Sequence, residues 1–219
     1  MPPHPKGAIL IEKSVRLEPL NIERLSEDLH NANVVDVDSL NLTFSPYGPF
    51  QRLDDYQNGW KLKLQKTIQL FFAIRRLTDG KAVGIASFLR INSTYGSIEV
   101  GHINYSSLLQ KTKEGTEAMY LMMMWAFENG YRRYEWKFNA LNLKSRYAAQ
   151  RLGFSYEGVF RRCCHTYLNT RKRHIKLMIM RHRNWTNPWE QLYVFVWRIV
   201  CFLDVFGGWS GYRFDCDNC

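Results

Sequence analysis

One stretch of this sequence, residues 98–127, constrains the fold more than any other. Residues 98–105 are apolar and β-branched enough to predict a strand, and a basic loop that contains Gly115 follows them. The Met-rich apolar run after Ala118 predicts a helix. A helix N-terminus presents unpaired N–H groups and a positive dipole end, so it favours a phosphate, and glycine permits close approach of a ligand. The order strand, loop, helix therefore indicates a candidate pyrophosphate site, although ordinary solvated turns share this pattern.

The size and charge of the chain bound its class. Its 219 residues suit one domain, or one domain with an appendage, and its net charge of +10 suits a polyanionic partner. Nucleic acid, an anionic membrane, a phosphate-rich cofactor and a generally basic surface without a specific partner all agree with this charge. The sequence has no zinc-finger spacing, no basic-region heptad and no aromatic RNA-binding motif. We therefore expect no nucleic-acid partner.

The two ends of the chain give little evidence of secretion or of a metal. Residues 1–6 lack the apolar core of a signal peptide, so the expected location is cytoplasmic and reducing. Cys216 and Cys219 have CxxC spacing but no second pair or histidine partner, so no metal is expected.

The hydrophobic periodicity predicts alternating strands and helices. An Asp79-Gly80 turn joins two of the strands as a hairpin, and Asn142 is placed to cap a helix. The expected helices are residues 22–31, 53–64, 119–127 and 143–152, and the expected strands are residues 15–20, 68–77, 82–91, 98–105, 131–138, 154–158 and 163–180. This order predicts a mixed α/β (α+β) sheet.

Four motifs in this order resemble the GNAT superfamily of acetyl-CoA-dependent N-acetyltransferases, and most closely the ribosomal-protein N-terminal acetyltransferase branch. They are Val100-Gly101-His102-Ile103, Gly115-Thr116-Glu117-Ala118, Asn139-Ala140-Leu141-Asn142-Leu143-Lys144-Ser145 and Arg151-Leu152-Gly153-Phe154. The resemblance implies a GNAT-like mixed, mainly antiparallel sheet flanked by helices, with a splayed pair of strands at the cofactor site. It places the domain at residues 14–183 and leaves residues 184–219 as an extension of unknown role.

The resemblance also implies which residues hold the cosubstrate acetyl-CoA. The pyrophosphate would lie on the loop before the helix, where Lys113 replaces a glycine usual in this branch. That change matters only if Lys113 must adopt a positive φ; Lys111 and Lys113 could instead add charge beside the phosphates, or simply be solvated. Asn142 resembles a cofactor-contacting asparagine, and it could equally act only as a helix cap. The expected cofactor contacts are Ile103, Asn104, Gln110, Lys111, Lys113, Glu114, Gly115, Thr116, Asn139 and Asn142.

The expected catalytic residues are Glu99, His102 and Ser145. An attacking amine must lose a proton, and Glu99 and His102 are the candidate bases, with Glu135 a weaker third. Because successive strand residues face opposite ways, Glu99 and His102 are not expected to share one site. Ala149 occupies the position where many superfamily members have a tyrosine acid. The pattern Asn142-x-x-Ser145 instead resembles the branch in which a serine near the sulfur protonates the departing thiolate.

Three hypotheses of function follow. The first is an N-acetyltransferase that moves an acetyl group from acetyl-CoA to a primary amine by direct attack in a ternary complex. The alternative is a non-catalytic GNAT-like module that binds CoA or a partner, and a basic nucleic-acid-binding domain is a weaker third. The acceptor amine, whether small molecule or peptide N-terminus, stays open, and the basic surface would tolerate an acidic or neutral one.

Residues 192–203 form an apolar run beyond the resemblance. This run is shorter than the roughly 20 residues of a membrane-spanning helix and contains Arg198. It could pack on the domain, form a homodimer contact, lie weakly at a membrane surface, or be a terminus replaced through a shifted or unspliced reading frame.

Overall fold

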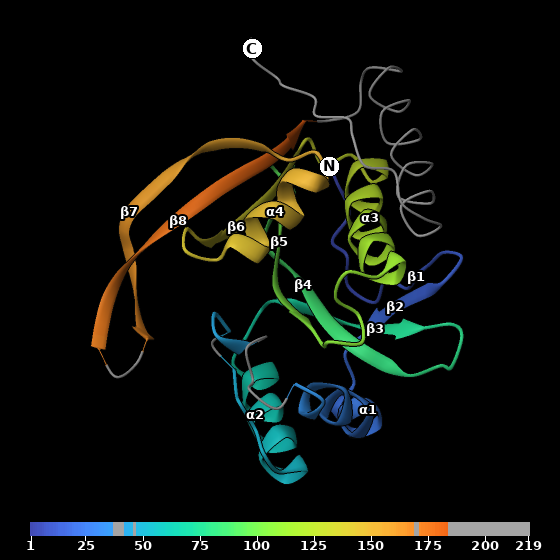
Figure 1. Cartoon of the computed structure of the whole chain (residues 1–219). Coiled ribbons are helices and arrows are strands. Elements are labelled where there is room, and N and C mark those ends of the chain that lie inside the picture. Colours follow the sequence, from blue (N-terminus) through green and yellow to red (C-terminus); the bar gives the residue numbers. More distant parts are fainter. Residues whose placement is uncertain (37–41, 46, 169–170, 184–219) are drawn as a thin grey trace, which may run out of the picture. The chain divides into compact units, whose positions relative to one another are not determined.

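The computed structural model describes residues 1–36, 42–45, 47–168 and 171–183, with side chains described through Arg161 (Figure 1). Strands and helices alternate along this part of the chain as the periodicity predicts. Their order is β1 (Leu10–Ile11), β2 (Val15–Pro19), α1 (Ile22–Val34), α2 (Leu53–Gln65), β3 (Leu70–Arg76), β4 (Ala82–Asn92), β5 (Ser97–Tyr105), α3 (Lys113–Glu128), β6 (Arg133–Asn139), α4 (Leu143–Arg151), β7 (Ser155–Leu168) and β8 (Arg171–Arg183).

The strands form one sheet in the order β1-β2-β3-β4-β5-β6-β8-β7. Neighbours pair antiparallel except β5 and β6, which are parallel and are connected through α3. The parallel ladder has only four residue pairs and ends where Val100 faces Trp136. Beyond that pair the two strands separate. The expected mixed, mainly antiparallel sheet with a splayed pair of strands is confirmed.

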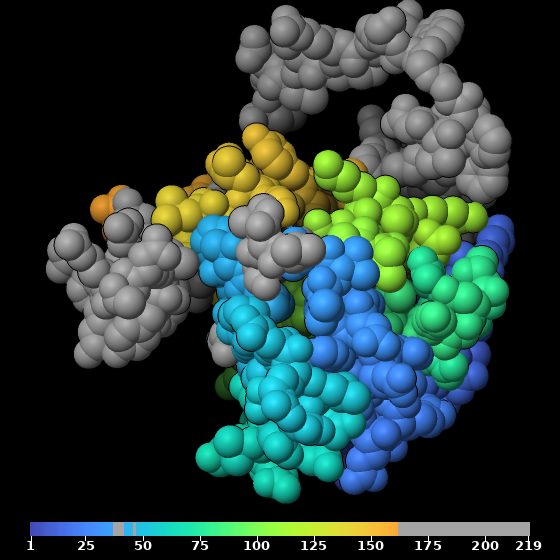
Figure 2. All heavy atoms as spheres, turned by 60° about the horizontal axis from the view of Figure 1, so that its bottom comes forward, coloured from blue at the N-terminus to red at the C-terminus, as the bar shows by residue number. Residues whose placement is uncertain are grey.

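Helices cover both faces of the sheet (Figure 1). On one side α3 packs on the sheet, and its buried Met122 shares a hydrophobic core with Val100 and Trp136. On the other side Leu25 and Leu29 of α1 and Trp60 of α2 form a second core. We call these the α3/α4 face and the α1/α2 face; Figure 2 looks onto the latter, with α1 in blue and α2 in cyan. The sheet therefore separates two differently lined surfaces.

The C-terminal hairpin differs from the expectation. Strands were expected at residues 154–158 and 163–180, but the structure has β7 over Ser155–Leu168 and β8 over Arg171–Arg183, and β8 pairs with both β6 and β7. A long hairpin can continue through charged residues because its backbone pairing does not depend on side-chain polarity. The apolar run at residues 192–203 and the extension at residues 184–219 lie outside the described residues.

Candidate active site

The separation of β5 from β6 opens the sheet at its centre. After Val100, residues 101–105 of β5 stay paired with β4 but have no partner on the β6 side in the described ladder. Extended backbone without a neighbour presents N–H and C=O groups that need partners. An extended polar arm inserted between the two strands would supply them. The functional residues expected on β5 and α4 lie around this opening.

A β-bulge in β5 changes which side chains face which surface. Ser87 of β4 lies opposite Gly101, but Ile85 lies opposite Asn104, so β5 carries one extra residue here, and His102 has a φ of 49°. His102 consequently contacts the ring of Phe71 on the α1/α2 face. Glu99 faces the same way, because its neighbour Val100 lies in the opposite core. The expectation that strand alternation would separate Glu99 from His102 is wrong, since simple alternation ignores the bulge.

Glu99 is engaged in a buried ion-pair network. Its carboxylate oxygens accept hydrogen bonds from Arg90 at 2.5 Å and from Lys137 at 2.7 Å, and its side chain is only 3% exposed. Lys137 also pairs with Glu135, which in turn pairs with Arg133. Each oxygen of Glu99 therefore already holds a cation. Glu135 is engaged in the same way, and these neighbouring cations lower its pKa against the opposing effect of burial.

His102 is held by a tyrosine that sequence reasoning did not single out. The Tyr47 hydroxyl lies 2.6 Å from His102 Nδ1, and the two rings are in contact with centroids 5.5 Å apart. Burial, followed by the nearby charges of Lys63 and Arg90, lowers the pKa of His102 to about 4. The imidazole is therefore neutral at physiological pH. Tyr47 comes from the connection between α1 and α2, so only the tertiary fold brings it to β5.

In the loop before α3, the residue with a positive φ is Lys111 and not Lys113, which stands where the family branch usually has a glycine. Lys113 is the first residue of the helix, whereas Lys111 takes the left-handed conformation with φ of 58°. Thr112 caps the helix, and its Oγ1 accepts a hydrogen bond from the Gly115 N–H at 3.1 Å. Glu114 and Thr116 lie in the same first turn. The position of Lys113 therefore needs no glycine, because its backbone is helical.

Gly115 is required by the protein's own packing. A Cβ at this position would lie 2.5 Å from the Leu109 carbonyl oxygen and 3.0 Å from the Tyr105 ring. The Tyr105 hydroxyl donates to the Gly115 carbonyl at 2.7 Å, and the Gln110 amide donates to the Tyr105 carbonyl at 2.9 Å. Gly115 and Gln110 thus fix the loop against β5. Both residues therefore shape the helix N-terminus.

Ser145 lies at the other side of the opening, at the start of α4. Asn142 caps this helix, and its Oδ1 accepts a hydrogen bond from Ser145 N–H at 3.1 Å. Asn139 Oδ1 accepts one from Leu141 N–H at 3.0 Å, which shapes the turn between β6 and α4. The indole N–H of the buried Trp136 donates to Ser145 Oγ at 3.1 Å. Trp136 is the second site residue that the sequence pattern did not reveal, because it reads as an ordinary core aromatic.

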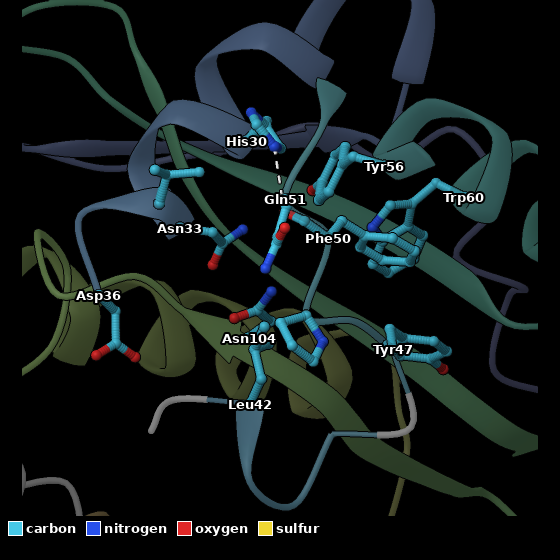
Figure 3. A pocket seen from close by; sticks show the side chains of 12 residues that line it. His30, Asn33, Asp36, Leu42, Tyr47, Phe50, Gln51, Tyr56, Trp60 and Asn104 are labelled. Carbon is cyan, nitrogen blue, oxygen red and sulfur yellow. Dashed lines mark hydrogen bonds between the residues drawn. The ribbon is translucent and has the colours of Figure 1, made fainter. Parts of the chain in front are cut away.

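A cavity of about 300 Å³ opens on the α1/α2 face, and its lining includes Tyr47, the hydrogen-bond partner of His102 (Figure 3). It lies between α1, the segment that leads into α2, and β5. Aromatic side chains form one wall, and amide, aliphatic and ionisable side chains line the rest. Its lining residues include His30, Asn33, Asp36, Leu42, Tyr47, Phe50, Gln51, Tyr56, Trp60 and Asn104. Asn104, expected to contact a cofactor, lies in this wall, while its neighbour Ile103 packs against the core of the α3/α4 face.

Comparison with known proteins identifies the fold and the family. Residues 17–155 match the family model described as an acetyltransferase (GNAT) domain. A GCN5-related N-acetyltransferase from Brucella melitensis is 32% identical over 84% of this chain and 81% of its own, with a TM-score of 0.76. The chain belongs to the GNAT acetyltransferase family. The resemblance expected from the four motifs is therefore confirmed, and the splayed strands are those of a GNAT domain.

Two further structures agree with this GNAT assignment. A probable GNAT-family acetyltransferase from Chromobacterium violaceum is 27% identical over 84% of this chain and 89% of its own, with a TM-score of 0.74. RimL, a ribosomal-protein alpha-N-acetyltransferase solved in complex with coenzyme A, has a TM-score of 0.64 at 16% identity, over 82% of this chain and 100% of its own, and shares the fold. No curated protein matches the sequence.

Among the described residues, no group of three or more His, Cys, Asp or Glu side chains is placed to hold a metal ion. Within the same part of the chain, no helix is both long enough and apolar enough to cross a membrane.

Proposed function

We propose that this GNAT domain transfers the acetyl group of acetyl-CoA to a primary amine by direct attack in a ternary complex. The observation that carries the proposal is the arrangement around the opening in the sheet. His102 lies on the α1/α2 face, beside a cavity, and Ser145 lies by the buried Trp136 of the opposite core. A proton can thus be taken from an amine on one side and given to a thiolate on the other.

The residues present fit coenzyme A. The N-terminus of α3, with Lys111 and Lys113 beside it, offers N–H groups and positive charge for the pyrophosphate. The unpaired side of β5 at Ile103 and Asn104 offers backbone groups for the amides of the pantetheine arm. Asn139 ends β6 and Asn142 caps α4, and their amide side chains offer further hydrogen bonds to the arm. When bound, acetyl-CoA supplies the electrophilic thioester carbonyl.

His102 is the better of the two candidate bases. Both oxygens of Glu99 are occupied by Arg90 and Lys137, so Glu99 could accept a proton only by giving up an ion pair. His102 is neutral, and the base role requires the tautomer in which Nδ1–H donates to the Tyr47 hydroxyl and Nε2 keeps a lone pair. In this scheme His102 takes the amine proton as the new N–C bond forms. Its low pKa makes it a weak base that is ready at any pH above about 5.

Ser145 completes the proton balance. As the C–S bond breaks, the sulfur takes the electron pair and needs a proton. The Ser145 lone pair is engaged by the Trp136 N–H, so the hydroxyl hydrogen is directed elsewhere and can be donated. The proton removed by His102 returns to solvent, and Ser145 recovers one from solvent. The chain thus needs no group beyond these two side chains and water.

Two measurements test the proposal. The first is the melting temperature with and without acetyl-CoA, where binding to the native state must raise it. The second is transfer of radiolabelled acetyl groups to a mixed panel of amines. Stabilisation together with transfer supports an N-acetyltransferase. Stabilisation without transfer to any amine indicates a non-catalytic CoA-binding module, and an unchanged melting temperature contradicts both.

A further inference from the structure

His102 has a backbone conformation that its surroundings must maintain. Its φ is 49°, at the bulge where β5 carries one extra residue against β4. A residue other than glycine keeps a left-handed backbone where neighbouring contacts determine it, and such residues gather at functional sites. Two rings supply these contacts, since the centroids of Phe71 and Tyr47 each lie 5.5 Å from that of His102. The imidazole is therefore held from β3 and from the connection between α1 and α2.

Tyr47 is itself fixed by its neighbours. Its ring packs on Trp60 of α2, with centroids 4.9 Å apart, and against Phe71 of β3, with centroids 6.5 Å apart. The ammonium group of Lys63 lies 5.1 Å from the centroid of the same ring. Figure 3 shows the tyrosine beside Trp60 on the aromatic side of the cavity. A tyrosine held in this way can fix the orientation of its own hydrogen-bond partner.

The two ring nitrogens of His102 have different surroundings. Nδ1 lies 2.6 Å from the Tyr47 hydroxyl oxygen. Among the described residues Nε2 has no hydrogen-bond partner, and it is not fully buried. One nitrogen is thus committed to the protein, and the other is open to a substrate.

A hydrogen bond between a phenol and a neutral imidazole can run in either direction, and the direction decides what Nε2 can do. If Tyr47 donates to Nδ1, the ring proton is on Nε2 and the open nitrogen is a donor. If Nδ1–H donates to Tyr47, Nε2 has a free lone pair and can accept a proton. Tyr47 allows the second direction because it is only partly buried, so its own hydroxyl hydrogen can turn toward water. Burial raises the pKa of Tyr47, so the hydroxyl keeps that hydrogen.

We propose that Tyr47 is a positioning residue for acetyl transfer, whose hydroxyl accepts Nδ1–H of His102 and so presents the Nε2 lone pair to the acceptor amine. This inference rests on the proposed function, in which His102 is the base. As the N–C bond forms, Nε2 takes a proton from the amine nitrogen, while Nδ1 keeps its own proton. The resulting imidazolium donates more strongly than the neutral ring, so the bond to Tyr47 strengthens as positive charge develops. Water then takes the proton from Nε2 and restores the base.

The first experiment reads the tautomer of His102 directly. Histidine labelled with an NMR-active nitrogen isotope is incorporated, and proton–nitrogen correlation spectra at neutral pH separate a protonated ring nitrogen from a bare one. The signals that disappear in His102→Gln identify the residue. We expect Nδ1 protonated and Nε2 bare in the wild type, and loss of this preference in Tyr47→Phe. A wild-type protein with Nε2 protonated would overturn the inference, and so would a tautomer that Tyr47→Phe leaves unchanged.

The second experiment measures kcat and KM for acetyl transfer. Tyr47→Phe keeps the ring and removes one hydrogen bond, so kcat should fall about tenfold while KM for acetyl-CoA stays near the wild-type value. Tyr134→Phe is the matched control, because the Tyr134 hydroxyl is buried in the opposite core and has no hydrogen-bond partner in the described part of the chain. That variant should keep the wild-type kcat. A wild-type kcat in Tyr47→Phe, or an equal loss in the control, would contradict a positioning role for Tyr47.

A double-mutant cycle tests whether the effect runs through His102. In the His102→Gln background, Tyr47→Phe should lower kcat little further, whereas fully additive losses would show that Tyr47 does not act through His102.

Failure of this inference is distinct from failure of the proposed function. Transfer at the wild-type rate by Tyr47→Phe would overturn the inference and uphold the acetyltransferase. Absence of transfer by the wild-type protein would overturn the proposed function, and the tautomer would still decide whether Tyr47 accepts Nδ1–H. Circular dichroism verifies the fold of each variant, and the wild-type tautomer decides the question even where a variant does not fold.

Discussion

At the scale of single residues, the contact between Trp136 and Ser145 has a consequence for catalysis. The indole N–H can only donate, so it fixes the direction of the serine hydroxyl through its lone pair. We predict that Ser145→Ala slows turnover about 100-fold with near-normal affinity for acetyl-CoA, as expected for loss of a general acid. Trp136→Phe should slow turnover about tenfold, because the ring is kept and one hydrogen bond is lost.

A double-mutant cycle separates this positioning role from a packing role. If Trp136 acts through Ser145, then Trp136→Phe should have little further effect on kcat in the Ser145→Ala background. Trp125→Phe is a control for loss of an indole, since Trp125 packs between Phe88 and Tyr131 in the same core. Fully additive effects of the two site substitutions on kcat would contradict the positioning role.

The low pKa of His102 predicts how stability depends on pH. Its pKa of about 4 in the folded protein lies below the unfolded value of 6.5, so the unfolded chain binds more protons between these values. Stability should therefore fall as the pH drops from about 6.5 toward 4. We expect the free energy of unfolding, measured by denaturant titration, to fall more between pH 7 and pH 5 in the wild type than in His102→Gln. An equal loss in both proteins would show that other groups carry the dependence.

At the scale of elements, Glu99 joins three strands. It lies on β5 and pairs with Arg90 of β4 and with Lys137 of β6. Removal of one partner from a buried ion pair leaves the other charge uncompensated. We predict that Glu99→Gln lowers the free energy of unfolding by about 3 kcal/mol while acetyl transfer persists. Denaturant titration and the transfer assay measure the two effects. Loss of transfer with unchanged stability would instead return Glu99 to the role of base.

The junction between the loop and α3 allows a paired prediction. Gly115→Ala should destabilise the protein by roughly 1–3 kcal/mol and weaken acetyl-CoA binding, because the added methyl group overlaps the Leu109 carbonyl. Lys113→Gly restores the family's glycine, but Lys113 is helical, so it should not strengthen binding and should cost the helix about 1 kcal/mol. Calorimetric titration with acetyl-CoA measures both. Tighter binding by Lys113→Gly would mean that the position needs more freedom than the helix allows.

The elements themselves could be predicted from the sequence, because hydrophobic periodicity and caps such as Asn142 act locally. The arrangement of the site could not be predicted to the same extent. The extra residue of β5 has no signature in the sequence around His102, and this residue decides which face His102 and Asn104 occupy. Tyr47 and Trp136 read as ordinary aromatics until the fold brings them to His102 and Ser145. Long-range contacts of this kind depend on the whole packing.

At the scale of the whole molecule, the net charge of +10 should act on the cosubstrate. Coenzyme A is a polyanion, and attraction between exposed charges is screened within about 10 Å at 0.1 M salt. We predict that the dissociation constant for acetyl-CoA rises when salt is added, mainly through a slower association rate. Stopped-flow binding at two ionic strengths checks this. A dissociation constant that does not change with salt would confine the recognition to short-range contacts.

The short, four-pair ladder between β5 and β6 determines how firmly the two halves of the sheet are joined. Five strands lie on one side of this junction and three on the other, and in the described sheet the strand pairing across it runs from Ser97 with Arg133 to Val100 with Trp136. A pantetheine arm that pairs with β5 would act as a ninth, removable strand. The cosubstrate would then stiffen the sheet by bridging its two halves. Each catalytic cycle would in this sense assemble and disassemble part of the fold.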